Sequence, residues 1–291
     1  MAKPGTEPAA CALRARTLAR TLPQAAEPLD FYARLVDLQR ALVAAHPSVL
    51  RLPASFRDAL DAEAAADAMP TLLKGLVAIS RPPVASAAAA MLEESHADWR
   101  HLVHTYWTGE RDGESLRLFI AEALLQPFAE SAASNAGAAG DRDSGGERPS
   151  GAGARDSTTD VGDAFRRPDL ANDGACRICG DRPVVAVLRE EAHGARRSLV
   201  CGFCLTERLA PRIACLHCGE TQFDKLSVYR AVEFPGVRVD ACDTCRTYLK
   251  TVDLTRDATA IPVVEDIASV ALDLWAREQG YQRLRPNLLR L

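Results

Sequence analysis

Residues 176–245 read CRICGDRPVVAVLREEAHGARRSLVCGFCLTERLAPRIACLHCGETQFDKLSVYRAVEFPGVRVDACDTC and contain eight of the chain's nine cysteines. A Cys-x-x-Cys turn can point both sulfurs at one ion, so each such pair supplies half of a tetrahedral thiolate site. Four pairs in one short stretch strongly indicate metal binding. The predicted ligands are Cys176, Cys179, Cys201, Cys204, Cys215, Cys218, Cys242 and Cys245.

The spacing of the pairs predicts how they combine. Long spacers of similar length separate the first pair from the second and the third from the fourth, and a short spacer lies between the second and third. Each long spacer contains two β-rich runs around a turn, at 183–188 and 198–200 and again at 222–233 and 237–239. We therefore predict sequential pairing into two tandem four-cysteine sites, each at the base of a hairpin.

The residues around the cysteines do not identify the metal. Gly180 and Gly219 follow the first and third pairs, where glycine can adopt a positive φ and direct backbone N–H groups at the sulfurs. The second and fourth pairs lack this glycine and so depart from a symmetric rubredoxin-type site. All-sulfur tetrahedral coordination suits zinc and iron equally. His193 and His217 are not needed as ligands beside eight thiolates.

Residues 1–130 predict an all-α helical domain. Apolar residues recur at helical spacing over 28–46, over 55–68 with a break at Met69-Pro70, over 84–107, and from about 113 onward. His96, His101 and His104 lie on the 84–107 segment without the Glu-x-x-His pattern of bundle metal sites. We interpret them as surface or hydrogen-bonded histidines.

The remaining boundaries follow from composition. Residues 131–172 are rich in Gly, Ala, Ser, Asp and Arg and predict a low-complexity flexible linker. The two rubredoxin-like, or zinc-ribbon-like, modules cover 173–210 and 211–256, and 247–252 reads as a closing strand. An apolar stripe over 264–275 predicts a C-terminal helix within 257–291. The predicted fold class is therefore α+β multidomain.

The overall composition bears on the location of the protein and on its partners. The N-terminus lacks the apolar core of a secretion signal, and no apolar run is long enough to span a bilayer. We therefore expect a cytoplasmic protein without membrane insertion, in which reduced cysteines hold metal rather than form disulfides. The formal net charge is −4, and acidic and basic residues nearly balance after 173. This balance weighs against nucleic-acid binding, although Arg196, Arg197 and Arg212 could cluster locally.

Three functional classes fit clustered Cys-x-x-Cys pairs. The first is a binding protein that presents a rigid surface to a protein partner. The second is a rubredoxin-like redox or electron-transfer protein, and the third is a nucleic-acid-binding zinc ribbon. The sequence contains no Ser/His/Asp set, phosphate loop or dinucleotide fingerprint. We therefore predict that the chain is not an enzyme.

The motifs CRICG, LVCGFC, CLHCG and ACDTCRTYLK, with the later segment ASVALDLWAREQGY at 268–281, closely resemble the FdhE family of formate dehydrogenase accessory proteins. The resemblance is specific over 176–281 and looser before it, where LFIAEALLQP at 118–127 matches best. The low-complexity stretch at 131–172 is not a feature of that family.

The resemblance implies a cytoplasmic assembly factor that binds the catalytic subunit of respiratory formate dehydrogenase before export and is required for active enzyme. It further implies iron in rubredoxin-like sites, with zinc as the alternative in recombinant material. The eight cysteines would be the ligands and would contribute to partner binding. It leaves open whether the chain forms a homo-oligomer.

Overall fold

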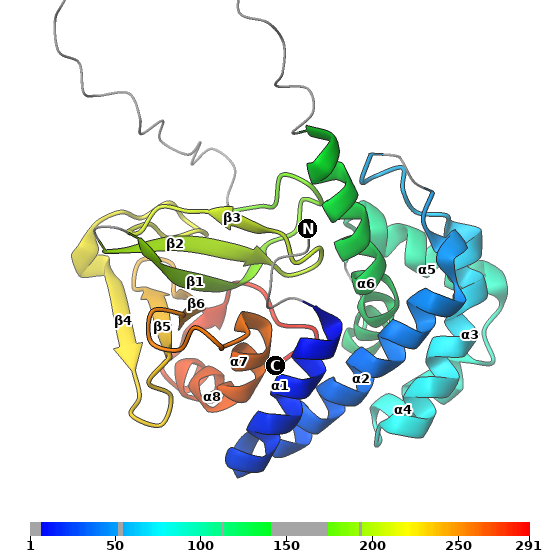
Figure 1. Ribbon diagram of the computed structural model, residues 1–291, viewed down its shortest axis with the longest axis horizontal. Coiled ribbons are helices and arrows are strands. Elements are labelled where there is room, and N and C mark those ends of the chain that lie inside the picture. The colour runs from blue at the N-terminus through cyan, green and yellow to red at the C-terminus, as the bar shows by residue number, and fades with distance from the viewer. Residues whose placement is uncertain (1–6, 52–54, 112, 141–173, 192–193) are drawn as a thin grey trace, which may run out of the picture.

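The computed structural model describes residues 7–51, 55–111, 113–140, 174–191 and 194–291. A helical half formed by the first part of the chain packs against a β-rich half formed by the second (Figure 1). None of the described helices combines the length and apolarity needed to span a bilayer.

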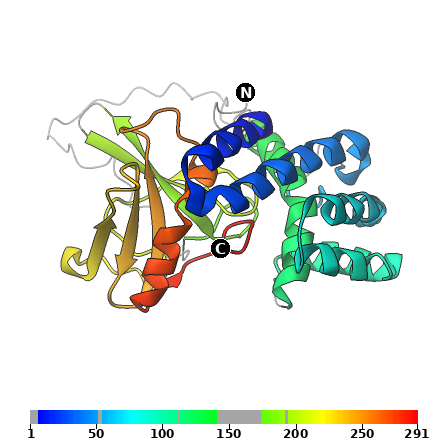
Figure 2. The same cartoon turned by 90° about the horizontal axis from the view of Figure 1, so that it is seen from below.

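Among the described residues of the first half, six α-helices form: α1 (Pro8–Thr21), α2 (Ala26–Ala45), α3 (Ala62–Ile79), α4 (Val84–Met91), α5 (His96–Thr108) and α6 (Ser115–Gly140). Short 3-10 turns, Pro23–Ala25 and Pro47–Val49, precede and follow α2. The buried residues of α2 include Leu35, Gln39 and Leu42, which recur at intervals of four and three residues along one helix face. Figure 2 shows α1 and α2 side by side between the sheet and the remaining helices.

The predicted break at Met69-Pro70 is wrong. Asp61 caps α3 by accepting hydrogen bonds from the backbone N–H groups of Glu63 (3.1 Å) and Ala64 (3.2 Å), and the helix then continues through Pro70. Proline removes one helical hydrogen bond. The buried stripe continues on both sides of it, with Met69 and Leu72 fully buried, and this packing offsets the loss.

The single helix predicted over 84–107 is instead two helices, α4 and α5. Ser95 begins α5 with a capping box: its backbone N–H donates to Asp98 Oδ2 at 3.1 Å, and its side chain accepts from the N–H of Asp98 at 3.3 Å. A capping box satisfies two otherwise unpaired donors and so favours a helix start at this position. The signal, Ser-His-Ala-Asp at 95–98, is present in the sequence.

The linker prediction is wrong over its first ten residues. Helix α6 continues to Gly140, and Ala132 and Ala133 are buried against the helical core. Alanine has the highest helix propensity, so an Ala-rich segment extends a helix that already has a surface to pack on. Residues 141–172 of the predicted linker lie outside the described residues.

The second half is built on one seven-stranded sheet. Its strands are β1 (Pro183–Glu191), β2 (Gly194–Cys201), β3 (Glu207–Leu209), β4 (Leu226–Arg230), β5 (Val237–Cys242), β6 (Thr247–Asp253) and β7 (Gln282–Arg283). The order is β3-β2-β1-β6-β5-β4, with β7 beside β6. The β1/β2 and β4/β5 hairpins are the two predicted ones, and parallel pairing of β1 with β6 joins them into one sheet.

Two short helices replace the single predicted C-terminal helix: α7 (Pro262–Ala268) and α8 (Val270–Glu278). The break falls at the fully buried Ser269, whose hydroxyl donates to the carbonyl of Glu265 at 2.8 Å. Helix α8 packs on the sheet through Leu272 and Ala276. Helix α7 contributes Val264 and other residues to the core of the helical half.

Glu130 on α6 provides a pH-dependent contribution to stability. Burial raises the pKa of Glu130 from 4.5 to about 7. The folded state therefore favours the protonated carboxyl, and stability is lost as pH rises from about 4.5 through 7, by up to about 3 kcal/mol. We expect the Glu130→Gln protein to lose less stability than wild type in urea unfolding between about pH 4 and about pH 8, a range that contains the whole window.

Wild type and the Glu130→Gln variant carry the same cysteines. Any pH dependence of metal binding is therefore common to both and cancels in the comparison. Identical changes in the urea midpoint of the two proteins would contradict the assignment of this effect to Glu130.

Candidate metal centres

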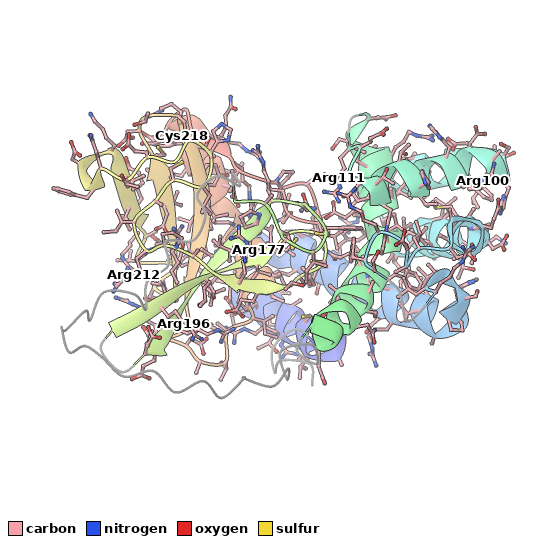
Figure 3. All side chains as sticks on the ribbon, turned by 90° about the horizontal axis from the view of Figure 1, so that it is seen from above. Arg100, Arg111, Arg177, Arg196, Arg212 and Cys218 are labelled. Atoms are coloured by element: carbon pink, nitrogen blue, oxygen red, sulfur yellow. The ribbon has the colours of Figure 1, made fainter. Side chains whose placement is uncertain are left out.

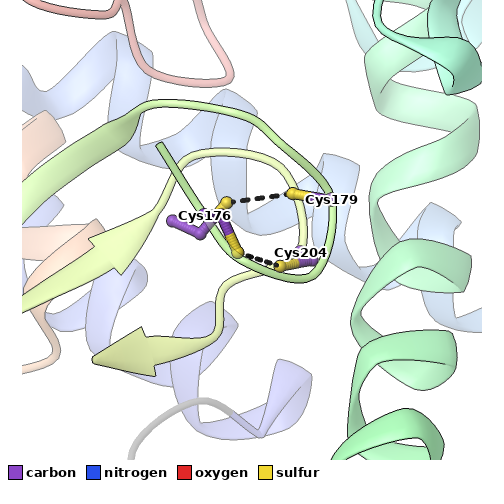
Figure 4. A group of neighbouring side chains, drawn as sticks. Cys176, Cys179 and Cys204 are labelled. Atoms are coloured by element: carbon purple, nitrogen blue, oxygen red, sulfur yellow. Dashed lines mark hydrogen bonds between the residues drawn. The ribbon is translucent and has the colours of Figure 1, made fainter. Parts of the chain in front are cut away.

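The first four-cysteine group lies where the β1/β2 hairpin opens. The Cys176 and Cys204 sulfurs are 3.6 Å apart, the Cys179 and Cys201 sulfurs are 3.3 Å apart, and all four lie within 4.8 Å of one another (Figure 4). A tetrahedral ion with metal–sulfur bonds of about 2.3 Å requires sulfur–sulfur edges of about 3.8 Å. The group is therefore close to the size of a tetrahedral thiolate site and could hold one metal ion.

The second group lies at the base of the β4/β5 hairpin. Its sulfurs approach at 3.6 Å between Cys215 and Cys245 and at 3.7 Å between Cys218 and Cys242. These four sulfurs also lie within 4.8 Å of one another and could hold a second ion. The cysteines thus group sequentially, first pair with second and third with fourth, as we predicted; metal ligation by them stays a prediction.

All four Cys-x-x-Cys turns adopt the same backbone bend. Gly180 and Gly219 both have a φ of 78°, as expected from their position. The other two turns reach the same left-handed region with ordinary residues, Leu205 at 55° and Arg246 at 58°. The missing glycines therefore do not make the two halves of a site different, although each non-glycine residue costs about 1 kcal/mol or more in this conformation.

The thiols of the first group cannot all be ionised together. Hydrogen bonds from Cys179, Cys201 and Cys204 lower the pKa of Cys176. The interaction with Cys176 in turn raises the pKa of the other three thiols, which keep their protons. A divalent cation removes this conflict because it balances the charge of several thiolates and displaces their protons.

The second group is more open and partly ionised. Burial raises the pKa of Cys215 and of Cys218. Burial also opposes ionisation of Cys245, but hydrogen bonds from the hydroxyl and backbone N–H of Thr247, together with those from Cys218 and Cys215, outweigh it and lower the Cys245 pKa to about 7. Cys218 is exposed, whereas no cysteine of the first group is.

The first group is embedded between the two halves of the protein. Phe203, between Cys201 and Cys204, is fully buried and enters the helical core. Its ring centroid lies 5.5 Å from Tyr106 and 5.7 Å from Trp107 on α5, both at steep interplanar angles. Edge-to-face contacts of this kind add to the energy of apolar burial. Sequence reasoning missed this role, although an aromatic residue inside a metal turn was a visible signal.

A buried ionic network surrounds the same junction. Asp181, two residues after Cys179, contacts Arg111 and Arg285 at 2.7 Å each. Arg285 also contacts Glu122 on α6 at 2.7 Å, and Arg290 contacts the other oxygen of Glu122 at 2.7 Å. The residues after β7 thus tie the first turn to the helical half.

Gly202 is required by this network. A Cβ at residue 202 would lie 2.2 Å from Nε of Arg285, closer than any side chain allows. The second pair therefore carries glycine between its cysteines so that Arg285 can pass close to the backbone.

The histidines do not join either cysteine group within the described part of the chain. His217 Nδ1 lies 3.3 Å from Arg182, and His96 Nε2 lies 3.0 Å from Asp67. His193 is outside the described residues. The ninth cysteine, Cys11, is buried in the helical core, and burial raises its pKa to about 12.

Comparison with known proteins finds sequence similarity over part of the chain. A family model described as "FdhE, C-terminal domain" matches residues 213–290. A protein named "Protein FdhE homolog" from Aquifex aeolicus is 40% identical over 116 residues, which cover 39% of this chain and 41% of that protein. Another of the same name, from Pseudomonas putida, is 34% identical over 122 residues, covering 39% and 37%. The matched stretch thus spans about two fifths of each relative.

The structural comparison covers nearly the whole chain. The crystal structure of the FdhE protein from Pseudomonas aeruginosa superposes with a TM-score of 0.66 and 24% sequence identity, covering 97% of this chain and 95% of that one. The helical half, the sheet and the cysteine turns therefore follow one known architecture. The chain therefore contains a segment that matches the FdhE C-terminal domain, and it shares its overall fold with an FdhE protein.

Proposed function

We propose that this chain is a metal-binding accessory protein that binds the catalytic subunit of a respiratory formate dehydrogenase and is required for its assembly into active enzyme. The observation that carries the proposal is the presence of two four-cysteine groups of metal-site dimensions within an FdhE fold. We further propose that the protein acts in the cytoplasm, before export of the subunit, and catalyses no reaction itself.

The eight cysteines would hold two ions, and iron is the ion that we favour. An ion at each group would neutralise the thiolates and keep the two turns of each site together. The first group lies at the junction of the two halves, where its role would be to stabilise the fold. The second group has the exposed cysteine, and we propose that the surface around it contacts the partner.

The test is capture of the catalytic subunit by the purified chain. Changing Cys242 and Cys245 to serine removes half of the second site, and we expect capture to fall by at least about tenfold, the scale at which changes around metal sites act. The measurement is the amount of subunit retained at fixed chain concentration, with metal content determined on the same sample.

Cys11→Ala is the matched control, because it removes a thiol that belongs to neither group. Capture by this control should equal capture by wild type. Full capture by the Cys242→Ser/Cys245→Ser protein would count against a role of the second site in partner binding.

A further inference from the structure

A concave surface adjoins the second four-cysteine group. It encloses a cavity of about 140 Å³ between the loop at 211–217, the β4/β5 hairpin and β6, and Cys215 and Cys242 form part of its wall. We call this surface the β4/β5 groove. The lining residues used below are Arg197, Arg212, Ile213, Phe223, Val228 and Arg238.

The groove exposes apolar side chains. Phe223 is 80% exposed, Ile213 57% and Val228 51%. The strand register explains Val228: it pairs with Asp240, whereas the alternate residues of β5, such as Val239, face the core beneath α8. Strand β4 also lies at the edge of the sheet. Clustered apolar exposure of this kind marks a binding surface.

The groove also carries surplus positive charge. Three arginines line it against a single carboxylate, Asp240, which is already engaged by Arg238 Nε at 2.8 Å and by the hydroxyl of Thr251 at 2.7 Å. Arg212 is exposed and has no carboxylate partner among the described residues, and it lies in the same β-rich half as Cys218 (Figure 3).

Arg197 lies buried beneath the groove. Its side chain is only 5% exposed; its Nη1 donates to the carbonyl of Pro211 at 3.1 Å, its Nη2 lies 3.5 Å from Asp240, and its buried Nε has no acceptor in the described part of the chain. A buried guanidinium donor without a partner is costly, and burial lowers the pKa of Arg197. Because Asp240 is shared between Arg197 and Arg238, the two arginines leave positive charge beneath the groove that favours an anion there.

We propose that the β4/β5 groove binds a segment of a partner protein in which a carboxylate lies next to a large apolar side chain. The apolar side chain covers Phe223 and Val228, and the carboxylate pairs with Arg212, with the buried charge of Arg197 behind it. The identity of the partner rests on the proposed function. A nucleic acid fits less well, because the exposed lining side chains Ile213, Phe223 and Val228 are apolar and the chain carries a formal net charge of −4.

The test measures the affinity of the metal-loaded full chain for the catalytic subunit by biolayer interferometry. Arg212→Glu and Val228→Asp alter exposed groove positions, so the fold should persist. We expect each to weaken binding by about tenfold or more. The controls, Arg57→Glu on the helical half and Val232→Asp, which is 90% exposed and outside the groove, should stay within about twofold.

The outcomes separate the two proposals. Strong capture that is unchanged by Arg212→Glu and Val228→Asp overturns the groove inference and leaves the proposed function standing. If wild type does not capture the subunit, the proposed function fails, and a phage-displayed peptide library then decides the groove. Enrichment of acidic-apolar peptides, lost in Arg212→Glu, supports the inference, and no such enrichment overturns it.

Two other occupants would also overturn the inference. Binding of a single-stranded oligouridine that is lost in Arg212→Glu would assign the groove to nucleic acid. Self-association in sedimentation that is lost in Val228→Asp would assign it to a second copy of this chain.

Discussion

Serine at Cys201 and Cys204 should abolish cooperative folding of the whole chain, whereas serine at Cys242 and Cys245 should leave the helical half folded. The first group shares its core with the helices: Cys176, Cys201 and Cys204 are buried there, and Phe203 between them packs on α5. Loss of metal at this group would release the turn that holds Phe203 in place.

The expected magnitude follows from two free energies. Binding of a structural zinc ion to a thiolate site contributes about 10–16 kcal/mol. The free energy of unfolding of a whole protein is typically about 5–15 kcal/mol. Loss of the first site therefore removes an energy as large as the total. The second site stabilises an outer hairpin with an exposed cysteine, so its loss should remain local.

Thermal unfolding followed by circular dichroism, with metal content measured on the same samples, checks this prediction. The Cys201→Ser/Cys204→Ser protein should show no cooperative transition of its helical signal, and the Cys242→Ser/Cys245→Ser protein should retain one. Cys11→Ala controls for loss of a thiol alone. Equal effects of the two double variants would refute the distinction between a structural and a peripheral site.

Asp273→Ala should destabilise the protein by about 3–5 kcal/mol, the usual cost of breaking a buried ion pair from one side. Asp273 Oδ2 lies 2.6 Å from Nζ of the fully buried Lys250, and its Oδ1 lies 3.0 Å from Arg283. Tyr248 also donates to Asp273, at 2.8 Å. Alanine would leave two buried cations with Asp266 as their nearest remaining carboxylate.

Urea unfolding measures this loss, and an exposed ion pair provides the control. Arg81 and Glu27 are 3.0 Å apart, but their side chains are 84% and 74% exposed. Because solvent screens such pairs, Glu27→Ala should change the free energy of unfolding by less than about 1 kcal/mol. A loss at Asp273→Ala no larger than at Glu27→Ala would show that the buried network contributes little.

Local signals predicted the parts of the fold that depend on local interactions. The hairpins at 183–200 and 226–242 follow from alternating apolar residues between fixed cysteine pairs. The parallel pairing of β1 with β6 joins residues far apart in the chain, and no local pattern encodes it. Pro70 was misread because packing of α3 outweighed its local preference, and the capping box at Ser95 was overlooked.

The candidate site likewise has a part that local sequence patterns predict and a part that they do not. The grouping of the eight cysteines follows from their spacing, because each long spacer matches one hairpin. The junction between the two halves does not follow from the spacing, because Phe203 and Arg285 contact helices that precede them by many residues. Arg197 and Arg212 were recognised as a local basic cluster, but Arg238 joins them in the groove only through the β4/β5 register, and Arg196 does not line it.

Glu122 has a consequence for synthesis of the protein. It is fully buried on α6, and its ion-pair partners are Arg285 and Arg290. An unpaired carboxylate in that position is strongly unfavourable. The helical half emerges from the ribosome first, yet it cannot reach its final packing until residue 290 has been translated. A nascent chain stalled before residue 285 should therefore be open to proteases and chaperones at α6.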